Sequence, residues 1–219
     1  MNKREEKTLN QDRSYENIIC QNSRKPEIRK ALLEYKTKYG ILRFFSYGSN
    51  LNEPDFKKKM LAIADDLEVS LKPSEAGLVH KNICTLNGFK RFLKNKSSNH
   101  GAAYTINPRK NHSVSGVCHD ITADALHPFM AKEALTIQSP NYKVIEINVE
   151  GETNPVLTLV GNNSINLKEL PKDDKLKALE YLKICIQGAS ILKINSDDMI
   201  ATKEYLTSLI KKESGGTNS

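Results

Sequence analysis

The 219-residue sequence lacks the features of several large protein classes. It has no tryptophan and no apolar run near the roughly 18 residues that a membrane-spanning helix needs. It opens with MNKREEKTLN and no apolar run behind those charges, so no secretory signal peptide is predicted. Cys20, Cys84, Cys118 and Cys185 are far apart and form no C-x-x-C motif, so neither a zinc site nor a thioredoxin-type pair is signalled. We therefore expect a protein of the reduced cytoplasm with no membrane partner.

The positive charge is concentrated near the N-terminus. Of a net charge of +7, residues 1–38 contribute ten Lys or Arg against six Asp or Glu, and the remainder has 23 against 20. A nucleic-acid-binding domain needs a basic face on its folded body, and this body is nearly balanced, so no nucleic-acid partner is expected. We interpret residues 1–40 as a charged N-terminal extension, partly disordered or one helix, 41–212 as the domain, and 213–219 as a disordered tail.

The hydrophobic pattern predicts an α+β fold, with a small mixed, barrel-like β-sheet flanked by helices. Residues 41–49 are aromatic and β-branched between glycines, which is typical of a buried strand. Residues 75–95 alternate enough for one long or two short strands. Residues 102–121 are interpreted as a hairpin of two strands around the segment 108–111.

Helix ends can be predicted from their capping residues. Gly40 is expected to end a helix that precedes the first strand. Asn52 or Glu53 is expected to cap the next helix, with Pro54 in its first turn. Thr122 is expected to cap a helix that continues through residue 135.

Residue chemistry alone supports no familiar catalytic motif. Ser49 follows a glycine, but the G-x-S-x-G motif is absent. His100, His112 and His119 have no metal-ligand spacing, so we expect surface or hydrogen-bonded histidines and no metal. The YGSN segment lacks the Lys-Ser/Thr of a phosphate loop, although Gly48 would let the backbone approach a ligand closely. The remaining possibility combines one carboxylate with a backbone cradle.

Four segments, taken in order, resemble the gamma-glutamylcyclotransferase family. They are FFSYGSNL, HGAAYTINPRKNHSVSGVCHDITADAL, FMAKEAL followed by NYKVIEINV, and YLKICIQGA. The resemblance extends over residues 42–209, nearly the whole body of the chain. One short motif would be weak, but four in the right order and spacing are fairly specific.

The resemblance implies a small mixed barrel with a pocket at one mouth, and an enzyme that releases 5-oxoproline from gamma-glutamyl compounds. It implies no metal and no organic cofactor, a small-molecule gamma-glutamyl substrate, and it leaves open whether the chain forms a homodimer. The family's catalytic glutamate falls on Glu133. Its substrate-cradling loop falls on Phe44, Phe45, Ser46, Tyr47, Gly48, Ser49, Asn50 and Leu51, and its pocket tyrosines fall on Tyr142 and Tyr181.

The implied chemistry makes physical sense for these residues. A gamma-glutamyl group carries its own nucleophile, the α-amine, which closes a five-membered lactam. Because the amine and the γ-carbonyl belong to the same molecule, much of the entropy cost of bringing two reactants together is avoided. One carboxyl can take the amine proton and later return it to the leaving group, and for this we expect Glu133 to be partly buried with a raised pKa. The amides of residues 48–51 are expected to hold the substrate carboxylate or the oxyanion.

The sequence also departs from the family pattern. The glutamate usually lies in Leu-Asp-x-x-Glu-Gly, and here Phe129, Met130 and Ala134 replace the Leu, Asp and Gly. A tyrosine common on a later strand is replaced by Leu159, and a Gly-Gly pair is Gly101-Ala102. These changes keep Glu133 and leave the identity of the substrate open.

Two other interpretations therefore stay open. One keeps the same reaction on a gamma-glutamylamine or another specialised γ-glutamyl conjugate. The other is a catalytically inactive module of the same fold that binds a small molecule or a protein. Glu133 argues against the second, and Leu159 and Met130 argue mildly for it.

Overall fold

A computed structural model describes residues 15–215, so the parts of the predicted extension and tail at 1–14 and 216–219 lie outside it. A short helix occupies residues 15–22. The other elements in chain order are α2 (Pro26–Tyr39), β1 (Leu42–Ser46), η1 (Ser49–Leu51), α3 (Glu53–Asp66), β2 (Val79–Ser97), β3 (Gly101–Ile121), α4 (Ala123–Lys132), β4 (Tyr142–Ile147), β5 (Val156–Gly161), α5 (Lys172–Ile191) and α6 (Asp197–Gly215).

The strands form one mixed sheet in the order β2-β3-β1-β5-β4. The short aromatic strand β1 lies in the middle, antiparallel to β3 and parallel to β5. The pairs β2–β3 and β4–β5 are antiparallel. A buried central strand is what the two phenylalanines of β1, Phe44 and Phe45, predict.

The hairpin predicted within residues 102–121 is wrong. This segment is the single long strand β3, and the hairpin joins β3 to β2 through residues 98–100. Asn87 pairs with Ser113 and Phe89 pairs with Pro108, so residues 109–112 form a wide bulge opposite one residue of β2. Proline and asparagine disrupt regular pairing in a bulge as they do in a turn, which explains why the segment resembles a turn in sequence.

The sheet curls toward a barrel. Its edge strand β2 changes register at several points, and such bulges increase strand twist and bend. Thr85 of β2 forms two backbone hydrogen bonds with Glu150, just beyond β4, at 3.1 and 2.8 Å. Asn95 forms a bridge with Ser164, just beyond β5. The two edges of the sheet are thereby joined through the segments that follow β4 and β5.

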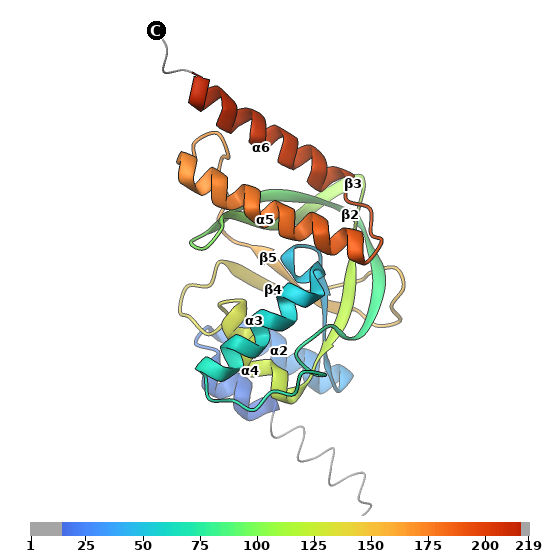
Figure 1. The fold of residues 1–219 in the computed structure, drawn as a ribbon. Helices are drawn as coiled ribbons and strands as arrows, with labels where there is room; N and C mark the ends of the chain where they lie inside the picture. The colour runs from blue at the N-terminus through green and yellow to red at the C-terminus, as the bar shows by residue number, and fades with distance from the viewer. Residues whose placement is uncertain (1–14, 216–219) are drawn as a thin grey trace, which may run out of the picture.

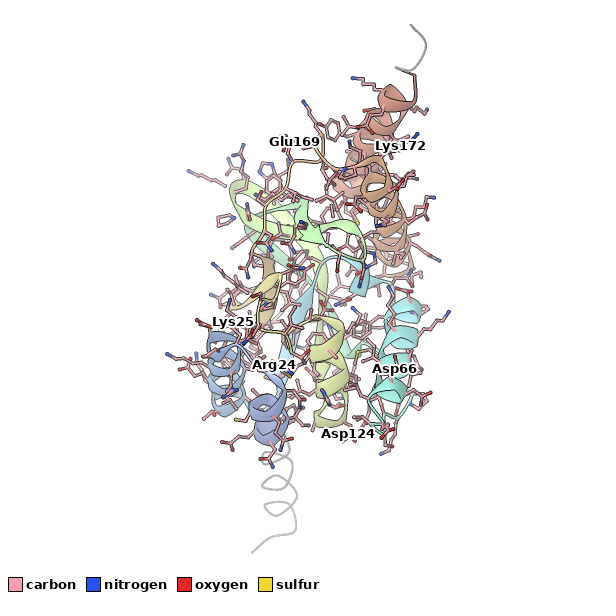
Figure 2. The ribbon with its side chains drawn as sticks, turned by 90° about the vertical axis from the view of Figure 1, so that its left-hand side faces the viewer. Arg24, Lys25, Asp66, Asp124, Glu169 and Lys172 are labelled. Atoms are coloured by element: carbon pink, nitrogen blue, oxygen red, sulfur yellow. The ribbon has the colours of Figure 1, made fainter. Side chains whose placement is uncertain are left out.

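The helices cover the two ends of this sheet (Figure 1). α5 and α6 lie together at one end, and α2, α3 and α4 gather at the other. Figure 2 shows the same separation, because Asp66 and Asp124 lie at the end opposite Lys172. None of the described helices combines the length and apolar character that crossing a membrane requires.

One core connects these layers, and α2 belongs to it. Phe44 of β1 and Phe129 of α4 are buried, with ring centroids 4.8 Å apart. Leu32 of α2 is fully buried in the same core, and the Tyr35 hydroxyl donates to the Pro155 carbonyl at 2.9 Å.

The capping predictions are confirmed. Gly40 ends α2 with a φ of 78°. Asn52 caps α3, with Pro54 in the first turn. The Thr122 side chain accepts from the Ala125 amide at 3.3 Å at the start of α4.

Candidate active site

A pocket of about 170 Å³ lies where the end of β1, the β2–β3 turn and the end of α4 meet. Leu51 is fully buried and does not line it. No residue of the described part of the N-terminal extension lines it either. The other predicted site residues all do: Phe44, Phe45, Ser46, Tyr47, Gly48, Ser49, Asn50, Glu133, Tyr142 and Tyr181.

The loop after β1 passes very close to α5 at Gly48. A Cβ on Gly48 would lie 2.8 Å from the Tyr181 hydroxyl oxygen. That oxygen is held in place, because it accepts a hydrogen bond from the Tyr104 amide at 3.2 Å. A larger residue at position 48 would therefore have to displace the Tyr181 hydroxyl. The Leu51 amide donates to the Gly48 carbonyl at 3.1 Å and is therefore not available to a ligand. Of the predicted amides of residues 48–51, those of residues 48–50 remain as candidates.

The end of α4 places Glu133 at the pocket. The helix ends at Lys132, earlier than the predicted residue 135, and Glu133 is its C-cap. The Leu135 amide donates to the Met130 carbonyl and the Ala134 amide to the Ala131 carbonyl, at 2.8 and 3.0 Å. This is a Schellman motif, which needs a left-handed residue directly after the cap. Ala134 supplies it with a φ of 54°, in the position where the family pattern has glycine.

Both hydrogen bonds to the Glu133 carboxylate are accepted by the same oxygen, Oε1. Oε1 accepts from Lys132 Nζ at 2.8 Å and from Asn50 Nδ2 at 2.9 Å. Lys132 Nζ also donates to Asn50 Oδ1 at 2.6 Å, which closes a three-membered polar cluster. The side chains of Lys132 and Glu133 are each only 11% exposed.

The expectation of a raised pKa for Glu133 is wrong. Burial alone would raise the pKa, because it penalises the charged form. The Lys132 ammonium, its hydrogen bond and the Asn50 amide together outweigh burial and hold the pKa of Glu133 below its usual value. The carboxyl is therefore ionised at neutral pH.

Comparison with known proteins adds to this geometry only at the level of solved structures. No protein-family model matches the sequence, and no curated protein matches it either. A structure described as a gamma-glutamyl cyclotransferase superposes with a TM-score of 0.51 at 19% identity, over 78% of this chain and 98% of that one. YkqA from Bacillus subtilis superposes with a TM-score of 0.52 at 16% identity, over 80% of this chain and 58% of YkqA.

The chain has a gamma-glutamyl cyclotransferase-like fold. The α+β, barrel-like fold expected from the order of the motifs is confirmed. At these identities the likeness concerns the fold alone, and the chain spans little more than half of YkqA's length.

Four tyrosines line the pocket of this gamma-glutamyl cyclotransferase-like fold, namely Tyr104 and the three predicted ones, Tyr47, Tyr142 and Tyr181. Tyr47 donates its hydroxyl hydrogen to the Leu159 carbonyl. Burial raises the pKa of Tyr142 to about 12, with the negative charge of Glu133 adding to the effect. Burial also raises the pKa values of Tyr47 and Tyr181 well above their usual value. The hydroxyls of the three predicted tyrosines are therefore neutral at physiological pH, and the hydrogen of the Tyr47 hydroxyl is already donated to Leu159.

Sequence reasoning missed Lys132 and His100. Lys132 directly precedes Glu133 but carries no motif, so only its adjacency could have drawn attention to it. His100 lies in the β2–β3 turn, with its ring centroid 5.1 Å from that of Tyr181. Burial, with the nearby charges of Lys59 and Lys132, lowers the pKa of His100. The misplaced hairpin hid this turn, and with it His100.

The other two histidines considered in the sequence, His112 and His119, lie outside the pocket lining. His119 is fully buried, and its Nε2 lies 3.0 Å from Ser46 Oγ. Burial lowers the pKa of His119 to about 4. His112 is exposed on β3.

One cluster of metal-ligating side-chain types also lies away from the pocket. The Sγ atoms of Cys84 and Cys118 and a carboxylate oxygen of Glu152 lie within 4.8 Å of one another. Both Glu152 oxygens already accept from Arg43, at 2.8 and 2.9 Å. The cluster is thus satisfied by an internal ion pair.

Proposed function

We propose that this protein is a gamma-glutamyl cyclotransferase, which releases 5-oxoproline and a free amine or amino acid from a gamma-glutamyl compound. The observation that carries the proposal is the Glu133 carboxylate. It is nearly buried, ionised, and lines the same pocket as the loop of residues 44–50.

The orientation of Glu133 suits a proton carrier. Its Oε1 is engaged by Lys132 and Asn50, and no described residue donates a hydrogen bond to its Oε2. A single open oxygen can take a proton from a bound amine and later deliver it, as general base and then general acid.

The proposed reaction is an intramolecular acyl transfer. As the neutral substrate α-amine attacks the γ-carbonyl carbon and forms the C–N bond of the lactam, one of its two protons passes to Glu133 Oε2. The amides of Gly48, Ser49 and Asn50 stabilise the oxyanion or hold the α-carboxylate. The γ-amide C–N bond then breaks as Glu133 returns the proton to the leaving nitrogen. No water is consumed, and Glu133 returns to its starting state.

The test is an assay of 5-oxoproline with a panel of gamma-glutamyl dipeptides, gamma-glutamylamines and glutathione. We expect Glu133→Gln to lower the rate by about 10²–10⁴-fold, the usual contribution of a positioned base. Glu180→Gln is the matched control, since Glu180 lies on α5 with a side chain that is 67% exposed. The same substitution there should leave the rate unchanged.

The panel also separates the alternatives. Turnover confined to gamma-glutamylamines or another γ-glutamyl conjugate would identify the specialised enzyme. No 5-oxoproline from the wild type on any compound would refute the proposed activity and favour a binding module of this fold.

A further inference from the structure

We propose that Lys132 is a positioning residue of this same site, a role that rests on the proposed function of Glu133. Its ammonium fixes one oxygen of the Glu133 carboxylate so that the other faces the pocket, and its positive charge favours the neutral, nucleophilic form of the substrate amine.

Lys132 is held from three elements. Its Nζ donates to Asn50 Oδ1 of η1 at 2.6 Å and to Glu133 Oε1 at the end of α4 at 2.8 Å. It also lies 5.1 Å from the ring centroid of Phe56 on α3, within the range of a cation–π contact. With its side chain only 11% exposed, Lys132 is largely shielded from solvent.

The direction of these bonds defines the role of Lys132. Lys132 and Asn50 both donate to Oε1, and Lys132 also satisfies the Asn50 oxygen, so the three groups hold one another. The carboxylate plane cannot rotate without breaking two hydrogen bonds at once. Oε2 is thereby presented in one orientation, and a misplacement of about 1 Å at a reacting group costs roughly 100-fold in rate.

Lys132 also places a positive charge beside Glu133, where the amine of a bound substrate would lie. Glu133 also interacts electrostatically with four other titratable side chains. They are His119 of β3, His100 of the β2–β3 turn, Tyr47 after β1 and Tyr142 of β4. The histidines have lowered pKa values and the tyrosines raised ones, so these four are neutral at pH 7.

A substrate ammonium bound at Glu133 would therefore lie beside the Lys132 ammonium, which contacts Glu133 directly. The charges of Lys59 and Arg91 also act on the pocket residues His100 and Tyr47. A neighbouring cation lowers the pKa of an amine and so increases the fraction that can attack. The same charge keeps Glu133 ionised and ready to accept the proton.

The kinetic test compares Lys132→Met with Lys132→Arg. We expect Lys132→Met to lower kcat about 100-fold with no rise in KM, because orientation is lost while repulsion of the substrate ammonium is relieved. The acidic limb of the kcat/KM profile should move to higher pH, because without the ammonium the pKa of Glu133 rises. Lys132→Arg keeps the charge and should restore most of the rate. Lys183→Met on α5 is the control, with a side chain 51% exposed in the wild type.

A second readout does not require turnover. The Glu133 carboxyl ¹³C signal can be titrated by NMR and assigned through its absence in Glu133→Gln. Its pKa should be higher in Lys132→Met than in the wild type, with Lys132→Gln as a second neutral variant if Lys132→Met does not fold.

The two proposals can fail separately. A wild type without activity removes the proposed function, while the titration still decides whether Lys132 controls Glu133. An unchanged Glu133 titration, or a higher kcat in Lys132→Met, would overturn the role of Lys132.

Discussion

Ala134 offers a direct test of how the end of α4 is built. Its φ of 54° is forced by the Schellman motif that follows Glu133. A residue with a Cβ pays roughly 1–2 kcal/mol in this left-handed conformation. Glycine removes that cost but adds unfolded-state entropy worth roughly 0.4–1 kcal/mol. Ala134→Gly should therefore stabilise the protein by about 0.5–1 kcal/mol.

This gain is measurable by urea unfolding or by calorimetry. For a chain of this size, 1 kcal/mol corresponds to a Tm change of about 2–4 °C, so a rise of about 1–4 °C is expected. Ala131→Gly is the matched control, because Ala131 lies within α4, where its φ is not positive. There the same substitution should destabilise by about 1 kcal/mol. If both variants lose stability to the same extent, the left-handed conformation of Ala134 is not a source of strain.

Two further predictions follow from the site and its surroundings. Gly48→Ala should greatly lower 5-oxoproline formation, because the new Cβ would lie 2.8 Å from the Tyr181 hydroxyl oxygen. Adding Tyr181→Phe removes that oxygen and should restore part of the activity. No recovery in the double variant would show that this contact is not the cause of the loss. His119 is buried and neutral with a pKa of about 4, below the usual 6.5 of its unfolded form. Between pH 6.5 and pH 4, His119 is protonated in the unfolded chain but not in the folded protein. Lowering the pH from about 6.5 to 4 should therefore lower the free energy of unfolding by about 3 kcal/mol. Urea unfolding at a series of pH values checks this, and His119→Gln should flatten the slope; an equal slope in the variant would assign the effect to other groups.

Local signals in the sequence predict the helix boundaries well where the physics is local. Asn52 and Thr122 each satisfy an amide three residues ahead, so a few residues contain the whole cause. The strand β1 is predicted for a similar reason, because its aromatic run between glycines suits only a buried extended segment. The length of β3 is not local. It depends on pairing with β2, so the bulge around residues 109–112 resembles a turn until its partner strand is known.

The candidate site shows the same division. The positions of Glu133 and Tyr181 follow from the order of the motifs, but the ionisation of Glu133 does not. Its low pKa depends on Asn50 of η1 as well as on Lys132, two residues 82 positions apart in the chain. The burial of Glu133 was predicted correctly, but the direction of its pKa shift was not. Lys132 and Asn50 lower this pKa by more than burial raises it, and only the tertiary structure brings Asn50 to Glu133.

The departures from the family pattern can now be sorted by where they lie. Met130 is fully buried in the core and does not line the pocket. Ala134 lines the pocket and also forms the turn that holds Glu133. Phe129 lines the pocket but also packs against Phe44, so its size is set by the core. Leu159 also lines the pocket, and its carbonyl accepts a hydrogen bond from the Tyr47 hydroxyl. A leucine there presents no hydroxyl to a ligand, so among these four departures Leu159 is the one with the most direct route to a different substrate preference.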